Sequence, residues 1–187
     1  MNYETRPITK DEYIEIIQTL RTGFLNHRPN AKVAMALVLE ANIGIRISDI
    51  TEFTLDKTIK EGDKYRLNLV EQKTGKQRSF TIPNELMQFI KQYCIDNNIK
   101  SNERIINITE RAVQKHLDFV CDYLGLKNVS THSFRKFFSH NLYDNNGEDM
   151  RIVQQALQHS SIETTMRYLK VDRSTVDKAL ENNVYIV

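Results

Sequence analysis

The sequence predicts a mainly α-helical domain with one small antiparallel β-sheet. Apolar residues recur at helical spacing along most of the 187 residues. Only residues 57–83 alternate between apolar and polar side chains in the manner of strands. The chain has no linker rich in proline, glycine or serine, no repeat and no low-complexity tract, so we expect one domain. This order of elements does not fit a doubly wound α/β fold.

Three helices are expected ahead of the sheet. The first follows Thr9 and Glu12, which form a capping box before apolar residues at helical spacing. The second covers residues 30–44, "NAKVAMALVLEANIG", which are apolar nearly all round, as in a central buried helix. Asn30 would cap its start and Gly44 would end it. "RISDITEF" then indicates a short third helix.

The sheet and the later helices follow in order. Alternation in "YRLNLV" and "RSFTI", with turns at "EGD" and "KTGK", predicts two or three antiparallel strands. Pro83 and Asn84 close the sheet and open the next helix. The helices expected from there on share an apolar periodicity, and they cover about 84–97, 109–124, 131–144, 148–157, 162–169 and 173–182.

Composition and charge limit the classes of function. With 40% hydrophobic and 27% charged residues, the balance is that of a soluble globular protein. No apolar run approaches the roughly 20 residues that span a bilayer, and the first residues lack a signal-peptide core, so we expect a cytoplasmic protein without a membrane partner. Cys94 and Cys121 lie far from any CxxC or histidine spacing, so we interpret them as buried free thiols. The net charge of +2 permits nucleic-acid binding but does not argue for it.

Candidate anion-binding residues lie in two stretches. In "THSFRKFFSHNL", His132 and Arg135 are three residues apart and share one face of the expected helix. An imidazole beside a guanidinium suits a phosphate, although both could simply cap or salt-bridge a surface helix. In "GIRISDI", Arg46 stands between Ile45 and Ile47, so we expect it to be partly buried and to need an anionic partner. That partner could be a structural carboxylate or a ligand phosphate.

The segment "KTGKQR" concentrates basic residues at an expected turn. Gly75 would supply the unusual backbone angles, and Lys73 or Lys76 would project from the tip. Such a lysine could be a solvated cation, or it could enter a DNA groove and donate a proton there. Lys76, Arg78 and Lys136 are further candidates for contact with DNA, although runs of charge are often only solvated surface.

A hydroxyl-rich segment, "LQHSSIETTMRYL", ends on a tyrosine. Ser160 or Ser161 would cap a helix on which Tyr168 falls about two turns later, and His159 precedes the serines. Tyr168 could pack that helix against the core. Because a tyrosine hydroxyl has a pKa near 10, it becomes a plausible nucleophile only where cations stabilise the phenolate and the charge of the transition state.

In this order, the candidate residues resemble the catalytic domain of the tyrosine recombinase family, which includes phage-type integrases and Xer-like recombinases. "GIRISDI" looks like the first-arginine box of that family, "HSFRKFFSHNL" like its His-x-x-Arg box and "LQHSSIETTMRYL" like the box that ends on the nucleophile. The resemblance covers about residues 6–180 and implies the fold of the DNA breaking-rejoining enzymes. Lys136 stands where many members have histidine, and Gln158 where glycine is usual. The catalytic positions that the resemblance implies are Arg46, Lys73, His132, Arg135, His159 and Tyr168.

The resemblance also implies a reaction. Tyr168 would attack a scissile DNA phosphate and leave a 3′-phosphotyrosine and a free 5′-hydroxyl. Arg46 and Arg135 would hold the non-bridging oxygens and stabilise the transition state. His132 would help to deprotonate the tyrosine or tune the phosphate, and Lys73 would protonate the departing 5′-oxygen.

The resemblance also implies the cofactors, the partners and the domain extent of the protein. His159 would hydrogen-bond a phosphate oxygen, and no cofactor or metal is expected, because cationic side chains supply the charge stabilisation. The partners implied are double-stranded DNA attachment sites and other copies of the chain: a homotetramer on DNA, and a monomer or weak oligomer without it. Residues 1–187 would form the catalytic domain, without the amino-terminal core-binding and arm-binding domains that members usually carry. The alternatives are type IB topoisomerase-like cleavage and religation, or a non-catalytic DNA-binding relic of the fold.

Overall fold

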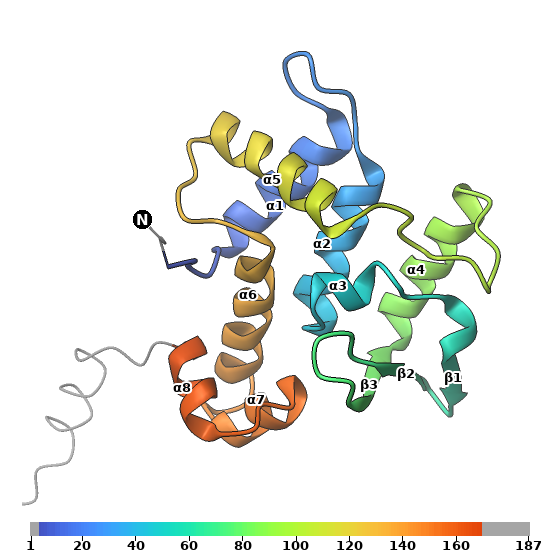
Figure 1. The fold of residues 1–187 in the computed structure, drawn as a ribbon, viewed down its shortest axis with the longest axis vertical. Coiled ribbons are helices and arrows are strands. Elements are labelled where there is room, and N and C mark those ends of the chain that lie inside the picture. Colours follow the sequence, from blue (N-terminus) through green and yellow to red (C-terminus); the bar gives the residue numbers. More distant parts are fainter. Residues whose placement is uncertain (1–3, 170–187) are drawn as a thin grey trace, which may run out of the picture. The chain divides into compact units, whose positions relative to one another are not determined.

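The structure, a computed structural model, describes residues 4–169 and divides between Phe138 and Ser139 into two compact units (Figure 1). The elements of the first unit are α1 (Lys10–Thr22), α2 (Ala31–Ile43), α3 (Ile47–Ile50), the 3₁₀ turn η1 (Leu55–Lys57), β1 (Thr58–Glu61), β2 (Lys64–Val70), β3 (Gln77–Pro83), α4 (Asn84–Asp96), α5 (Glu110–Leu124) and the first half of α6 (Thr131–Asp144). The second unit holds the rest of α6, α7 (Met150–Leu157) and α8 (Ile162–Leu169). The mainly helical class with a small antiparallel sheet is confirmed, and the helix expected over 173–182 lies outside the described residues.

Helix α2 forms the centre of the first unit. It contacts α1, α3, α5 and strand β3 (Figure 1). Nearly all of its side chains are buried, as the all-round apolar pattern predicts. Both predicted ends are confirmed, because the Asn30 side chain accepts a hydrogen bond from the Val33 amide and Gly44 is left-handed with φ 69°. A Cβ on Gly44 would lie 2.3 Å from the Phe138 ring. The position therefore needs glycine for space as well as for its backbone angle.

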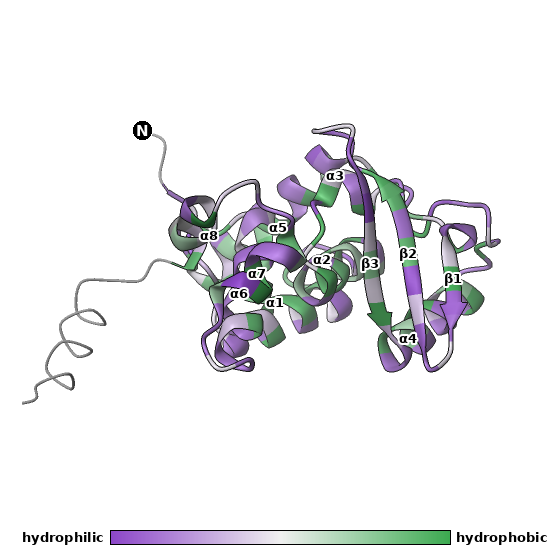
Figure 2. Ribbon diagram, turned by 90° about the horizontal axis from the view of Figure 1, so that it is seen from below, coloured by the Kyte–Doolittle hydropathy of each residue, from purple (hydrophilic) through white to green (hydrophobic). Residues whose placement is uncertain are grey.

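The three strands form one antiparallel sheet in the order β1–β2–β3. Hydrophobic and hydrophilic residues alternate along the strands (Figure 2), and in β3 the buried positions are Arg78, Phe80 and Ile82. Helix α4 packs on β2 and β3, with Met87 and Ile90 fully buried. The sheet thus has one face covered by α4 and α2, and the β2–β3 turn projects from its end.

The start of α1 is tied to the loop between α5 and α6. The predicted Thr9–Glu12 capping box is present. Glu12 also pairs with Arg6, whose Nη2 lies 2.6 Å from the carboxylate. The Arg6 amide donates to the carbonyl of Asn128 at 3.0 Å. These contacts fix the chain before α1 against the segment that leads into α6.

Both cysteines are free and buried, as expected, with Cys94 on α4 and Cys121 on α5. Burial raises the pKa of the Cys121 thiol to about 12, so this side chain stays protonated and behaves as an apolar group. Along residues 4–169, none of the helices combines the length and the apolar character that a membrane crossing requires.

Candidate functional site

Arg46 lies between the glycine that ends α2 and the first turn of α3. Its backbone is extended, with φ −71° and ψ 149°, and the flanking Ile45 and Ile47 are buried. The Arg46 side chain is 21% exposed, and its Nη1 donates to Oε1 of Glu71 at 2.5 Å. Of the two partners left open by the sequence, a carboxylate of the protein itself therefore holds this guanidinium in the structure.

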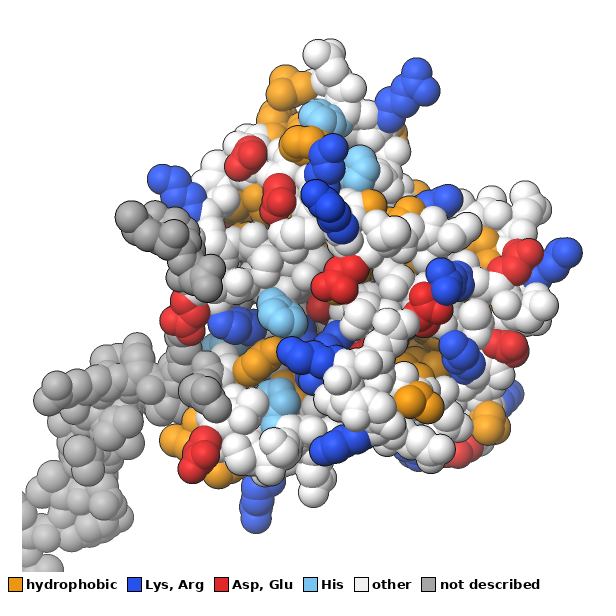
Figure 3. Space-filling model, in the orientation of Figure 1, with side chains coloured by type: hydrophobic (Ala, Val, Ile, Leu, Met, Phe, Trp, Pro, Cys, Tyr) orange, Lys and Arg blue, Asp and Glu red, His pale blue; other side chains and the backbone are white. Residues whose placement is uncertain are grey.

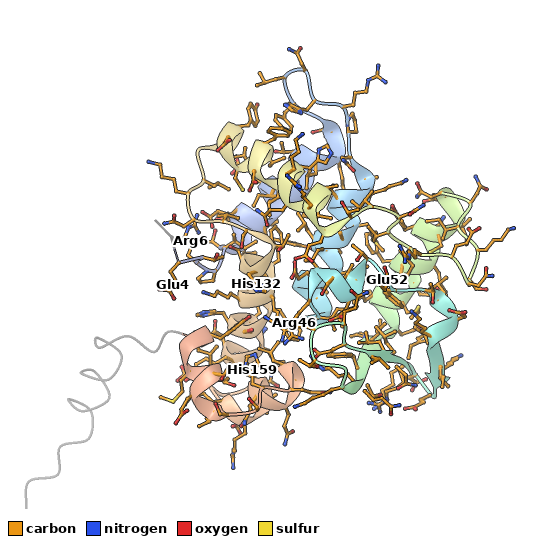
Figure 4. All side chains as sticks on the ribbon, viewed as in Figure 1. Glu4, Arg6, Arg46, Glu52, His132 and His159 are labelled. Atoms are coloured by element: carbon orange, nitrogen blue, oxygen red, sulfur yellow. The ribbon has the colours of Figure 1, made fainter. Side chains whose placement is uncertain are left out.

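Helix α6 supplies a second arginine and a histidine from its first two turns. The Arg135 side chain is buried, and its Nη1 donates to the carbonyl oxygen of Gly44. His132 lies one turn earlier and is exposed. Figure 4 labels His132 on α6 and Arg46 just before α3. Arg135 thus ties α6 to the backbone two residues before Arg46.

The environment of His132 shows which cations gather around it. The pKa of His132 is lowered, first because the surrounding protein desolvates the imidazolium and then because Arg135, Lys73 and Arg46 repel a further positive charge. At neutral pH the imidazole is therefore uncharged and can accept a proton. The structure brings together, in the first unit, four of the six positions that the sequence singled out.

The turn between β2 and β3 carries the two candidate lysines. Lys73 and Lys76 are both exposed, and Gly75 has φ 67°, as the predicted tight turn requires. The turn is closed at its base, where the amide of Glu71 donates to the carbonyl of Lys76 at 3.0 Å. The Glu71 carbonyl accepts from the Gly75 amide at 2.8 Å. Lys73 therefore projects from a turn with its own backbone hydrogen bonds.

Two other cations proposed as DNA contacts are bound within the protein. The Arg78 side chain is 1% exposed and donates to the carboxylate of Glu71. The pKa of Arg78 is lowered to about 10, mainly by burial and then by the charge of Arg135. Lys136 is also buried, and its Nζ donates to the carbonyl of Thr5. In this structure both side chains support the fold, whereas Lys76 stays exposed.

Sequence reasoning missed three buried carboxyl groups close to these cations. Glu71 lies between two arginines, and Asp49 accepts a hydrogen bond from the Gln72 amide at 2.9 Å. Glu40 on α2 is fully buried, and burial raises its pKa well above the ordinary value although Arg135 opposes the shift. The position of Glu40 in an otherwise apolar helix was a usable signal, because a buried acid needs a polar neighbour. Glu71 and Asp49 stand in polar stretches and carry no such signal.

The second unit brings His159 and Tyr168 together. Their ring centroids are 4.9 Å apart, and Nδ1 of His159 lies 3.0 Å from Oγ1 of Thr165. Helix α7 ends at Gln158, which adopts the left-handed conformation with φ 49° that glycine usually takes at this position. Ser161, one of the two serines expected as the cap, accepts a hydrogen bond from an amide in the first turn of α8 at 3.3 Å. Local contacts therefore set the tyrosine beside the histidine.

Charge elsewhere on the first unit is mixed. Toward the right of Figure 3, over α4 and β1, lysine and arginine side chains alternate with aspartate and glutamate. Ion pairs of the first unit outside the cluster include Arg66 with Glu61 at 3.2 Å and Arg104 with Glu52 at 2.7 Å. The small net positive charge is thus not spread as a basic surface over these elements, and the cluster around His132 is a local feature.

Comparison with known proteins identifies relatives. The model of the phage integrase family matches residues 6–175. The probable integrase/recombinase YoeC of Bacillus subtilis is 29% identical over 174 residues, which are 89% of this chain and 91% of that protein. The tyrosine recombinase XerA of Pyrococcus furiosus is 24% identical over 187 residues, which cover 94% of this chain and 61% of that protein.

Solved structures share the fold. The site-specific recombinase XerH, in a post-cleavage complex with a palindromic difH substrate, gives a TM-score of 0.72 at 17% identity and covers 97% of this chain and 54% of that one. A lambda integrase dimer bound to a core site gives a TM-score of 0.69 at 18% identity, and the match covers 90% of this chain and 60% of that one. The chain thus spans most of the Bacillus protein but less than two thirds of XerA, XerH and the lambda integrase fragment.

Proposed function

The chain belongs to the phage integrase family, and we propose that it performs site-specific DNA recombination through a 3′-phosphotyrosine intermediate. The observation that carries the proposal is the gathering of cations from α3, α6 and the β2–β3 turn around His132. A phosphodiester gains negative charge as it is attacked, and a fixed set of cations stabilises that charge. The relatives named as integrases and recombinases support the same reading.

In the proposed cleavage step, the Oη of Tyr168 attacks the phosphorus of a DNA phosphodiester. A bond forms between this oxygen and phosphorus, and the bond from phosphorus to the 5′-oxygen breaks. Arg46 and Arg135 would bind the non-bridging oxygens, because the planar fork of N–H donors on a guanidinium matches the geometry of phosphate oxygens. Rejoining is the reverse reaction, with the 5′-hydroxyl of another strand as nucleophile, so no external energy source is needed.

Two proton transfers accompany the step. The tyrosine proton would pass to His132, whose lowered pKa keeps the imidazole neutral and able to accept it. The departing 5′-oxygen is a strong base, and Lys73, exposed at the end of its turn, would give it a proton. His159, beside Tyr168 in the second unit, would donate a hydrogen bond to a phosphate oxygen. Tyr168 and His159 would have to meet the phosphate that the first unit binds.

The proposed partner is double-stranded DNA that carries an attachment site, in the compartment that holds that DNA, which we expect to be the cytoplasm. XerH is named as a complex with a difH substrate, and the lambda integrase as a dimer bound to a core site. Lys76 is exposed on the same turn as Lys73 and is proposed to contact the DNA backbone. Strand exchange between two sites needs several nucleophiles, so we propose a homotetramer on DNA and a monomer or weak oligomer without it.

The experiment combines capture and identification of the DNA. Residues 1–187 are incubated at low salt with duplexes that carry a nick within a randomised sequence, so that the short cleaved fragment diffuses away and the covalent product accumulates. The wild type should give a protein–DNA adduct that survives denaturant, and Tyr168→Phe should give none. An adduct of equal yield with Tyr168→Phe would remove this tyrosine from the mechanism.

A topoisomerase or a binding relic would behave differently. The sequences captured in the adduct are placed as two sites on one supercoiled plasmid. A recombinase yields exchanged products and four-way junctions, whereas a topoisomerase-like enzyme only relaxes the plasmid. A non-catalytic relic of the fold would bind the DNA and form no adduct. We expect exchanged products, because the named relatives are recombinases.

A further inference from the structure

The carboxylate of Glu71 accepts three hydrogen bonds at the foot of the turn that carries Lys73. Its carboxylate is buried, with a side-chain exposure of 4%. Oε1 accepts hydrogen bonds from Nη1 of Arg46, at 2.5 Å, and from Nη1 of Arg78. Oε2 accepts from Oγ1 of Thr74 at 2.7 Å. One carboxylate therefore divides its two oxygens between the arginines on one side and the turn on the other.

The backbone of Glu71 strengthens the same link. Its amide and its carbonyl close the turn through the carbonyl of Lys76 and the amide of Gly75. Thr74, which the carboxylate holds, directly follows Lys73 in the chain. Glu71 thus contacts both the turn and Arg46, although Arg46 lies 25 residues before Glu71 in the sequence. One residue therefore sets the conformation of the turn and the position of Arg46.

A carboxylate at this place would be unfavourable for phosphate binding alone. Its negative charge repels a phosphate that approaches the Arg46 guanidinium, so a protein selected only for affinity would gain by a neutral side chain here. A carboxylate that weakens phosphate binding can still raise the reaction rate if it holds hydrogen-bond donors where the negative charge develops in the transition state. If Glu71 has a positioning role, its removal should lower the cleavage rate without lowering DNA affinity. If its role is merely structural, its removal should lower both.

We infer that Glu71 is a positioning residue for the proposed reaction, which aligns Arg46 through one carboxylate oxygen and the Lys73 turn through the other. The inference rests on the proposed function and deepens it. Arg78 is the buried counter-cation that lets the carboxylate stay charged while Arg46 also faces the substrate. Glu71 itself would not touch the phosphate or the tyrosine.

The decisive variant is Thr74→Val, because Thr74 is exposed and the change keeps Glu71 while removing its bond to Oε2, together with the longer bond that the Thr74 hydroxyl accepts from the Lys76 amide at 3.4 Å. It should slow cleavage of normal DNA by about tenfold, a part of the roughly 10²–10⁴-fold that general acid catalysis contributes, because Lys73 is misplaced and not removed. With a 5′-bridging sulfur substrate the leaving thiolate needs no proton from Lys73. Thr74→Val should then cleave at the wild-type rate. Equal slowing on both substrates would overturn the inference.

Glu71 variants remove the contacts to Arg46 and to the Lys73 turn together. Glu71→Ala should lower cleavage by about 10²-fold, the scale of one lost donor to a developing oxyanion, with only partial recovery on the sulfur substrate. DNA affinity should stay equal or rise, because a negative charge has gone. Glu71→Gln keeps an acceptor for Arg46 and should stay within about tenfold of the wild type. It also serves if the alanine variant does not fold.

The matched control is Glu61→Ala, which removes an exposed carboxylate paired with Arg66 on the same sheet and should change nothing. Melting and circular dichroism confirm folding at the assay temperature. If the wild type forms no adduct, the proposed function fails and this inference with it. If the wild type forms the adduct and the folded variants Glu71→Ala and Thr74→Val cleave DNA at the wild-type rate, only the inference fails. The inference also fails alone if Glu71→Ala lowers DNA affinity and cleavage rate by the same factor.

Discussion

The cation site of the first unit and the His159–Tyr168 pair of the second are built in opposite ways. In the first unit, Arg135 reaches a carbonyl 91 residues away in the chain, and Arg46 reaches Glu71 across 25 residues. In the second unit, the ring of His159 bonds a threonine six residues later. The first site is assembled by the tertiary fold, whereas the second is assembled by two short helices and the loop between them.

The difference predicts how substitutions should act. A side chain in the first site also holds the fold together, so its removal should change stability as well as chemistry. A side chain in the second site is held by local contacts, so its removal should change chemistry with less effect on the unfolding free energy. The predictions below test this contrast, from the largest expected effect to the smallest.

Arg46→Ala and Arg135→Ala should each lower cleavage by about 10²–10³-fold, because each removes a donor to the developing charge on phosphate. DNA affinity should change only modestly. The two should differ in stability: Arg135→Ala removes a buried charged donor and should cost about 2–3 kcal/mol, while the partly exposed Arg46 should cost less. Single-turnover cleavage, DNA titration and urea unfolding measure the three quantities. Equal falls in affinity and rate would make the arginines ground-state contacts.

Lys73→Ala should slow cleavage of normal DNA by about 10²-fold, as expected for loss of a general acid. A substrate with a 5′-bridging sulfur should restore most of the rate, because a thiolate leaves without a proton. Lys76→Ala is the matched control on the same turn: it should weaken DNA binding, but with the DNA saturated it should cleave both substrates near the wild-type rate. If Lys76→Ala shows the rescue instead, the acid has been assigned to the wrong lysine.

His132 predicts a dependence on pH. Its pKa lies below the unfolded value of about 6.5, so cleavage should rise with pH below that value and level off near neutrality. Between the folded and unfolded pKa values the unfolded chain binds more protons, so stability rises with pH there and falls on acidification. His132→Gln should flatten both profiles and slow cleavage about 10²-fold. His116→Gln on α5 is the control, and an unchanged acid limb in His132→Gln would assign the titration elsewhere.

Gln158→Gly should have the smallest effect, and it should raise the free energy of unfolding where the other substitutions lower stability or activity. Gln158 holds a left-handed backbone, which costs a side-chain-bearing residue about 1–2 kcal/mol, partly offset by the greater unfolded-state freedom of glycine. A gain of about 0.5 kcal/mol is expected in thermal unfolding. The reverse change, Gly125→Gln at the left-handed end of α5, should lose a similar amount. A loss of stability in Gln158→Gly would show that the glutamine side chain is needed.

The same contrast explains what the sequence could predict. Helix ends such as Thr9, Asn30 and Gly44 depend on caps and glycine within a few residues, and all were predicted at the right places. His132 and the three catalytic candidates around it, Arg46, Lys73 and Arg135, were named from local motifs, but their counter-charges were not. Glu71 is brought to Arg46 only when the sheet packs beside α3, so no local pattern marks it. Burial of Arg78 was missed for the same reason.

The most direct test of the account is the identity of the residue that carries the DNA. The trapped adduct from residues 1–187 is digested with nuclease and protease, and the modified peptide is sequenced by mass spectrometry. We predict a single nucleotide linked through its 3′-phosphate to Tyr168. A phosphate on any other residue, or a linkage through the 5′-phosphate, would contradict the proposed transesterification.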